Sequence, residues 1–217
     1  MPDAPSDPRD ALVAYVAAAV PLAPAEADAL RQRAAVRALA AGEPWVREGD
    51  RRPEVALVAA GVLRVYFLAD GDEVTAYFAT EGQMVSDYEA FLTGEPSRMT
   101  VEAAEPTTLA VLDRAAVEWA YRELAHGDRL GRLVAERLFL ATHRRLAAFY
   151  LESAEDRYAR LVAEHPGLVQ RVPQHVVASY VGVRPQSLSR IRRRIAEGAR
   201  SGGAGEPRRS GPEGRRS

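Results

Sequence analysis

Residues 174–191 constrain the fold more than any other segment, because several of their positions satisfy one packing geometry. Two short helices that cross steeply need a small residue where they approach, and Ala178 stands at that position. The following turn needs a residue that tolerates a positive φ angle, which Gly182 supplies. Pro185 suits the first turn of a second helix, where its missing N–H costs nothing. The segment is therefore predicted to be a helix-turn-helix.

The second predicted helix has an outward face of polar and basic side chains, with no carboxylate before Glu197. Glutamine and arginine suit bidentate contacts to adenine and guanine edges in the major groove, and further arginines suit phosphates. This combination predicts that the helix reads double-stranded DNA. The candidate DNA-contacting residues are Gln186, Ser187, Ser189, Arg190, Arg193 and Arg194.

Charge is divided unevenly along the 217-residue chain. Residues 1–170 hold 18 Arg and 27 Asp or Glu, a net −9, whereas residues 171–217 hold 11 Arg and 3 Glu, a net +8. A basic C-terminal part on an acidic body is typical of a nucleic-acid reader with a separate sensing or assembly part. A solvated basic tail would produce the same count, so charge alone leaves both interpretations open.

Short β-leaning runs replace the helical pattern from residue 42 onwards, and turns that contain glycine separate them. Asp70-Gly71 lies between two such runs and is typical of a hairpin turn. Many short strands at a spacing of roughly 8–12 residues indicate a sandwich or a barrel-like roll. The predicted fold class is α+β, with a jelly-roll-like β-roll. The strand-like runs are 55–58, 62–68, 74–78, 99–103 and 107–112.

A long helix is predicted from about residue 128 to residue 151, with apolar side chains at helical spacing. An apolar stripe of this length needs a partner surface. It can pack on its own β-roll, or it can pair with the same helix of a second copy. We favour the pairing, which predicts a homodimer. The stripe residues are Leu130, Val134, Leu138 and Ala141.

These patterns divide the chain into five predicted segments. The first contains helices that lead into the sensor domain, one of them predicted over residues 25–39. The last is rich in Gly, Ser, Pro and Arg and is predicted to be disordered. The segments are N-terminal helices (1–41), a β-roll sensor domain (42–127), a dimerisation helix (128–152), a helix-turn-helix domain (153–197) and a basic tail (198–217).

Composition narrows the possible chemistry. The chain has no cysteine, which removes disulfides, thiolate nucleophiles and cysteine-ligated metal sites. All four histidines lie outside residues 42–112, so the roll lacks the histidine ligands that a cupin-like metalloenzyme needs. No residue pattern supports a haem sensor either. We therefore expect no enzyme activity, no metal and no cofactor. The acidic, Pro-rich start and the absence of an apolar run of about 18 residues predict a cytoplasmic protein without membrane contact.

A β-roll, a long helix and a C-terminal winged helix-turn-helix, in this order, resemble the Crp/Fnr family, whose sensor is a cyclic-nucleotide-binding-like domain. The resemblance covers about residues 25–197 and is most specific in 78–103 and 172–195. It implies a homodimeric transcription regulator whose Gln186 and Arg190 occupy base-contacting positions. It also implies two DNA half-sites about one helical turn apart and RNA polymerase as a further partner.

The chain departs from the family's cyclic-nucleotide cassette. The residue pair Ser86-Asp87 stands where the family has Gly-Glu, and Ser97-Arg98 stands where it has Arg followed by a small residue. In an extended chain, a shift of one residue points the guanidinium of Arg98 to the opposite face of the strand. A buried cyclic phosphate would then lack the positive charge that compensates its own negative charge. We therefore expect a sensor that does not respond to cyclic AMP, with an effector that the sequence does not identify.

The segment after Ile195 contains Gly, Ala, Ser and Arg where family members have an apolar strand pair, which predicts a truncated wing or none. Two alternatives stay open beside the hypothesis of a regulator that does not respond to cyclic AMP. One is a cyclic-nucleotide-responsive regulator. The other is a protein-interaction module whose helix-turn-helix no longer reads DNA.

Overall fold

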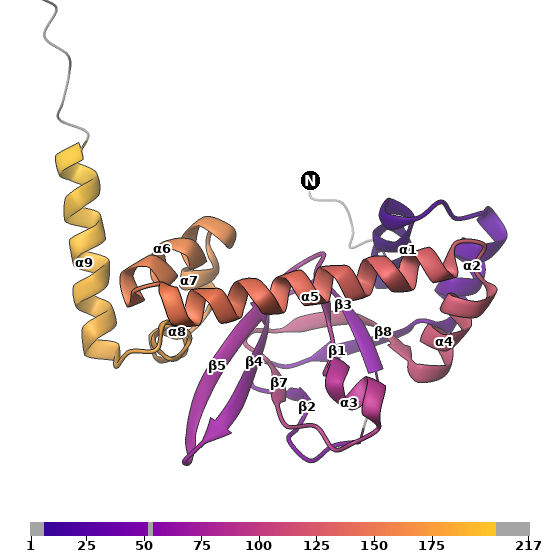
Figure 1. Cartoon of the computed structure of the whole chain (residues 1–217), viewed down its shortest axis with the longest axis horizontal. Helices are drawn as coiled ribbons and strands as arrows, with labels where there is room; N and C mark the ends of the chain where they lie inside the picture. Colours follow the sequence, from indigo (N-terminus) through magenta and orange to yellow (C-terminus); the bar gives the residue numbers. More distant parts are fainter. Residues whose placement is uncertain (1–6, 52–53, 203–217) are drawn as a thin grey trace, which may run out of the picture.

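The structure is a computed structural model that describes residues 7–51 and 54–202. A β-roll with helices on one side is joined by one long helix to a helical C-terminal part (Figure 1). The helices are α1 (Pro8–Ala19), α2 (Pro24–Arg33), α3 (Tyr88–Thr93), α4 (Arg114–Glu123), α5 (Gly127–Leu151), α6 (Ala154–Glu164), α7 (Leu168–Arg171), α8 (Gln174–Val181) and α9 (Pro185–Gly202). The strands are β1 (Ala35–Leu39), β2 (Pro44–Val46), β3 (Glu54–Ala60), β4 (Leu63–Ala69), β5 (Asp72–Ala79), β6 (Met84–Val85), β7 (Thr100–Ala103) and β8 (Thr107–Asp113).

The roll consists of two antiparallel four-stranded sheets. Their strand orders are β1-β8-β3-β6 and β2-β7-β4-β5. The inner faces of the sheets enclose a core of small and branched side chains, among them Val58, Val65 and Leu109. The β-roll that the strand pattern predicted is therefore confirmed, and β4 and β5 are joined by the expected turn at Asp70-Gly71, both with positive φ angles.

The N-terminal segment differs from the prediction of a helix over residues 25–39. Helix α2 ends at Arg33, and residues 35–39 form β1, which pairs with β8 along its whole length. Its Ala- and Arg-containing sequence has helical propensity, but hydrogen bonds to β8 complete the sheet and outweigh this local preference. The roll therefore begins at residue 35 and not at residue 42.

Two helical layers cover the roll at different places. Helices α1, α2, α4 and the start of α5 pack on the outer face of the sheet that contains β3 and β8. Helices α6 to α9 share a second core, which includes Val62 and Phe78 of the roll. The core of these C-terminal helices thus extends onto the roll through these two residues.

Helix α9 continues to Gly202 and so includes the first five residues, 198–202, of the predicted basic tail. The remainder of that predicted tail, residues 203–217, lies outside the described residues. Within the described part of the chain, no helix combines the length and the apolar character that crossing a bilayer requires.

Candidate DNA-reading and sensor sites

Helices α8 and α9 form the helix-turn-helix that residues 174–191 predict. Gly182 ends α8 with a φ angle of 77°, and Pro185 is the first residue of α9. The buried side chains of Leu188 and Ile191 pack α9 into the core around Ala178. Each local requirement of the motif is therefore met in the structure.

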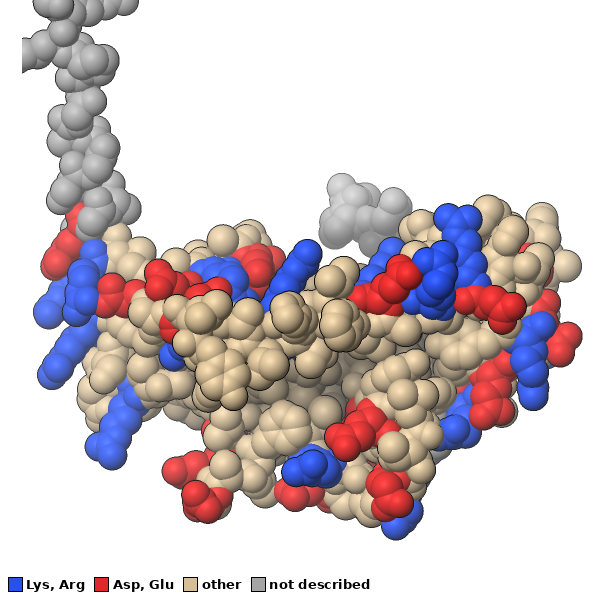
Figure 2. All heavy atoms as spheres, in the orientation of Figure 1, with Lys and Arg blue, Asp and Glu red and all other residues tan. Residues whose placement is uncertain are grey.

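The outward face of α9 is exposed to solvent over residues 186–194. All six predicted DNA-contacting side chains are exposed. By helical spacing, Gln186, Arg190 and Arg193 form one row on the side opposite Leu188. Arginines gather at this end of the molecule (Figure 2).

Two of the arginines on this face have acidic partners. The Arg194 guanidinium pairs with the carboxylate of Glu155 on α6, and Arg193 lies 3.9 Å from the carboxylate of Glu197, one turn further along α9. The sequence did not indicate the first pair, because 39 residues separate its members. Arg190 has no ion-pair partner among the described residues.

No strand follows α9 within the described residues, because the segment from Ile195 to Gly202 continues the helix. This observation is consistent with the prediction of a truncated wing or none up to that point. The outward face of α9 is therefore the candidate DNA-contacting surface of the described residues.

The helix-turn-helix docks on the open edge of the roll. Strand β5 is an edge strand, and its free backbone groups are met by Ser179 of α8. The Ser179 hydroxyl donates to the Glu73 carbonyl at 2.6 Å and accepts from the Thr75 N–H at 2.9 Å. Covering an edge in this way satisfies backbone groups that would otherwise be open to other strands.

An ion cluster joins α7 to two loops of the roll. Arg171 lies 2.5 Å from carboxylate oxygens of both Glu81 and Glu105. The hydrogen bonds from Arg171 lower the pKa of Glu81 to about 2. The guanidinium and the two carboxylates thus hold the two parts of the protein together through charge-assisted hydrogen bonds.

Arg157 forms hydrogen bonds both near the end of the long helix and at the end of α8. Its guanidinium donates to the Val181 carbonyl at the end of α8, at 2.7 and 3.0 Å, and to the Glu152 carbonyl just beyond α5, at 2.6 Å. This one guanidinium therefore joins the end of α5 to the end of α8.

Two residues of the candidate effector cassette, Asp87 and Ser97, bind each other. Asp87 begins α3, and its carboxylate accepts the Ala90 N–H at 3.1 Å and the Ser97 hydroxyl at 2.6 Å. Both side chains are buried, whereas Arg98 is exposed. Ser86 donates to the Glu54 carbonyl at 2.9 Å. Ser97 and Arg98 thus differ in burial, as expected for neighbouring residues that point to opposite faces of an extended chain.

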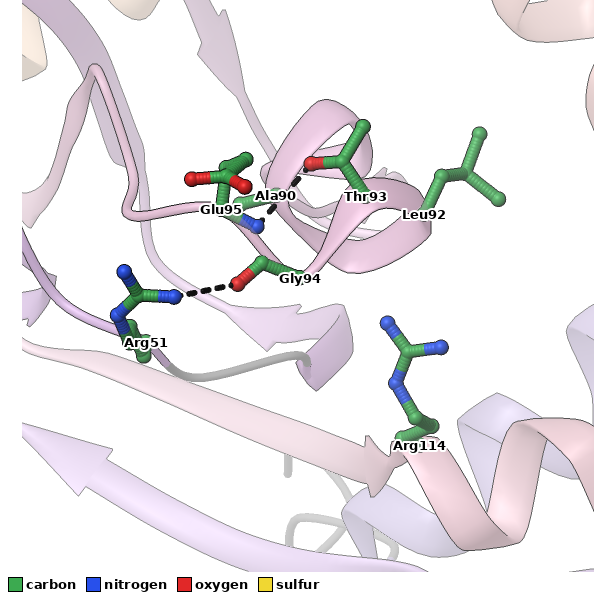
Figure 3. Close-up of a pocket in the computed structure, with 7 residues that line it drawn as sticks. All are labelled: Arg51, Ala90, Leu92, Thr93, Gly94, Glu95 and Arg114. Carbon is green, nitrogen blue, oxygen red and sulfur yellow. Dashed lines mark hydrogen bonds between the residues drawn. The ribbon is translucent and has the colours of Figure 1, made fainter.

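Two arginines near this cassette stabilise α3 (Figure 3). Arg51 donates to the Gly94 carbonyl at 2.9 Å, and Arg114 donates to the Phe91 carbonyl. Cations at a helix C-terminus satisfy carbonyls that have no partner within the helix. Both guanidinium groups are thus engaged with the main chain of α3.

The predicted dimer stripe of α5 has two different surroundings. Leu130 and Val134 pack into the protein's own core with α1 and α4. Leu138 and Ala141 lie on the same side, against a cavity beside the roll. Packing on the roll was the alternative that we did not favour. The first half of the stripe thus packs on the protein itself, whereas Leu138 is 38% exposed, and pairing of this helix with a second copy stays a prediction.

A different side of α5 carries the exposed apolar residues. Phe139 is 69% exposed, Leu146 54% and Tyr150 74%. Their spacing of seven and four residues places them on one face of the helix. Helix α5 crosses in front of the roll in Figure 1, and its middle is mainly uncharged in Figure 2.

The histidines do not assemble a metal centre in the described part of the chain, where no three His, Cys, Asp or Glu side chains come together as ligands. His165 ends α6, and burial lowers its pKa. None of the four histidines lies on a strand of the roll.

Comparison with known proteins agrees with this architecture. Residues 36–123 match the family described as the cyclic nucleotide-binding domain. No curated protein matches the sequence. Among solved structures, FixK2 from Bradyrhizobium japonicum is 19% identical, with a TM-score of 0.64 over 76% of this chain and 86% of that chain.

Two further structures extend the comparison. The catabolite activator protein of Thermus thermophilus is 26% identical, with a TM-score of 0.50 over 85% of this chain and 88% of that chain. A regulator assigned to the Crp/Fnr family from Eubacterium rectale is 17% identical, with a TM-score of 0.60 over 82% of this chain and 85% of that chain. Residues 36–123 therefore match the cyclic nucleotide-binding domain, and the chain as a whole has the fold of these solved regulators, one of them assigned to the Crp/Fnr family.

Proposed function

We propose that the protein is a sequence-specific DNA-binding transcription regulator, not an enzyme, that acts in the cytoplasm as a homodimer. The observation that carries this proposal is the outward row of Gln186, Arg190 and Arg193 on α9. Two amide- and guanidinium-bearing side chains one turn apart can read adjacent base edges in a major groove. RNA polymerase is the partner that such a role implies.

The homodimer forms through the exposed side of α5. Phe139, Leu146 and Tyr150 give it a seam with the seven- and four-residue spacing of helix pairs. Two-fold pairing along α5 would place two α9 helices on the same side of a duplex, which suits two half-sites about one helical turn apart. Rotation of the two readers about α5 would then change DNA affinity as a population shift.

The sensor of this regulator does not use cyclic AMP. The Asp87 carboxylate is already bonded to Ser97, and Arg98 is exposed on the other side of the chain. A cyclic phosphate placed there would lack a charged partner, and burying an uncompensated anion is costly.

A double variant tests DNA reading by α9. We expect Gln186→Ala with Arg190→Ala to weaken binding to a selected palindromic site about a hundredfold, because two bidentate base contacts are lost. Arg192→Ala is the matched control. Its side chain is exposed, but it follows Leu188 by four residues and so lies toward the packed side, and we expect at most about a threefold effect. Affinity is measured at about 150 mM salt on genomic fragments selected by the protein without ligand.

The second candidate, a protein-interaction module with a reader that no longer functions, is favoured by the continuation of α9 where wing strands would follow. That candidate predicts equal binding by the double variant and the wild type, which would remove α9 as the reader. Repeating the measurement with cyclic AMP should leave every affinity unchanged. An increase with cyclic AMP would instead restore the cyclic-nucleotide-responsive alternative.

A further inference from the structure

The chain turns from α5 into α6 through two residues, Glu152 and Ser153, and both have extended backbone angles. Rotation about the φ and ψ angles of a few such residues is enough to swing one part of a protein against another. The last turns of α5 add little packing that would restrain this rotation, because only Ala148 is buried in residues 144–151. Contacts made by other side chains therefore set the angle between α5 and the helices that follow it (Figure 1).

One half-buried side chain, that of Arg157 on α6, spans this bend. It donates to the Glu152 carbonyl at 2.6 Å and twice to the Val181 carbonyl, at 2.7 and 3.0 Å. These two carbonyls lie at the ends of α5 and α8, where main-chain acceptors lack a donor within the helix. The residue four positions after Val181 is Pro185, which has no N–H to donate. A guanidinium can bind both acceptors at once, because its N–H groups form a rigid fork.

The other polar contacts of these C-terminal helices lead to different elements. Ser179 and Arg171 bind the roll. Arg160 lies one turn after Arg157 and also reaches the end of α5, where it pairs with the Glu152 carboxylate at 3.0 Å. Its hydrogen-bond partners, however, lie at the end of α5 and on α6, and not on α8. Among the described residues, Arg157 is thus the side chain that hydrogen-bonds both the end of α5 and the end of α8.

We propose that Arg157 is a positioning residue, which fixes the angle between α5 and the reader (α8 and α9) and thereby the spacing of the two DNA half-sites. This inference rests on the function proposed above, because it takes α5 as the dimer helix and α9 as the DNA-contacting helix. Helix α9 packs on α8 through Leu188 and Ile191, so a rotation of α8 relative to α5 also moves α9. In a two-fold dimer the rotation occurs twice, which changes both the separation and the rotational phase of the two α9 helices.

The first test measures this angle without DNA. The chain has no cysteine, so Arg144→Cys on α5 and Arg192→Cys on α9 place two spin labels at known, exposed positions of the full chain. Labelled protein is mixed with an excess of unlabelled protein, so that the measured distances lie within one protomer, and double electron–electron resonance gives their distribution. We expect Arg157→Gln to widen this distribution about twofold, because the bend loses the hydrogen bonds that span it. Arg160→Gln is the matched control and should keep the wild-type width.

The second test measures the preferred spacing of the half-sites. The selected palindrome is lengthened or shortened at its centre by one base pair, which shifts one half-site by about 3.4 Å and rotates it by about 35°. We expect the wild type to bind these altered sites at least about thirtyfold more weakly, and Arg157→Gln to lose at most about threefold. A merely structural role of Arg157 would instead lower the affinity for every site by the same factor. Base changes within a half-site should affect both proteins alike, because the side chains of α9 are the same.

Arg157→Lys is the decisive variant if Arg157→Gln does not fold, because it keeps the charge but lacks the rigid fork. It should lie between the wild type and Arg157→Gln in both tests. A distance distribution that neither Arg157 variant widens would overturn the proposal, and is the result expected if the contacts with the roll alone fix the reader. An equal widening by Arg160→Gln would also overturn it. The spin labels report without DNA, so a wild type that binds no palindrome would contradict the proposed function and still leave the angle to be measured.

Discussion

Gly61 lies in the turn between β3 and β4, where a side chain would collide with the neighbouring loop. A Cβ atom there would lie 2.4 Å from the Thr107 Oγ1 atom and 2.7 Å from its Cα atom. The φ angle is also positive, at 98°, and the Gly61 N–H donates to the Glu81 carboxylate at 3.0 Å. Both the close approach and the backbone conformation therefore require glycine.

We expect Gly61→Ala to lower the free energy of unfolding by about 2–3 kcal/mol, because backbone strain and steric overlap add at this position. Gly82→Ala is the control, since Gly82 has a φ angle of 76° but open space around its Cβ position. It should cost about 1 kcal/mol, from backbone strain alone. Denaturant unfolding measures the free energy of unfolding of both variants. An equal loss in the two variants would show that the overlap of the new Cβ atom with Thr107 is relieved without an energetic cost.

Two arginines, one within the roll and one between the roll and α7, make polar contacts that differ in burial. Arg64 of β4 is only 4% exposed, and its guanidinium is matched by Thr75 and Glu73 of β5. Burying a cation in this way requires that its donors be satisfied. The second polar contact, Arg171 with Glu81 and Glu105, is more open to solvent.

The pH dependence of stability should report the Arg171 contact. Hydrogen bonds from Arg171 lower the pKa of Glu81 from its ordinary value of 4.5 to about 2. A depressed pKa contributes stability that is complete above pH 4.5 and is lost as pH falls through about 2. We therefore expect the unfolding free energy of the wild type to fall more steeply between pH 4.5 and pH 3 than that of Glu81→Gln. Glu89→Gln, an exposed change on α3, should keep the wild-type slope, and parallel curves for all three proteins would contradict this assignment.

The molecule as a whole is organised along α5, which contacts the roll on one side and exposes apolar residues on another. Leu130 and Val134 belong to the core, whereas Phe139, Leu146 and Tyr150 are largely exposed. Exposed side chains of this size on one helix face are typical of an interaction surface. We interpret that surface as the place where a second copy binds.

We expect Phe139→Glu to raise the Kd of the dimer about a hundredfold, because a buried carboxylate without a partner would face the seam. Sedimentation at several protein concentrations measures the change. Leu92→Glu is the control, since Leu92 is 61% exposed but lies on α3. A wild-type protein that stays monomeric at every concentration, or a Phe139→Glu variant that dimerises normally, would contradict pairing through this face.

The sequence by itself determined the features that depend on neighbouring residues. The turn at Gly182 and the start of α9 at Pro185 both appear where the local sequence predicts them. These features follow because φ preferences and capping bonds act within a few residues. Alternation and helical periods likewise identified most strands of the roll and the long helix.

Only the tertiary structure decided the features that depend on residues far apart in the chain. Residues 35–39 became a strand because β8 offers hydrogen bonds, although their composition favours a helix. Leu130 turned to the roll and Phe139 to the surface because a helix period shows that an apolar stripe exists, but not which partner it meets. The bond between Asp87 and Ser97 and the docking of Ser179 on β5 form across folded loops, so no local pattern contains them.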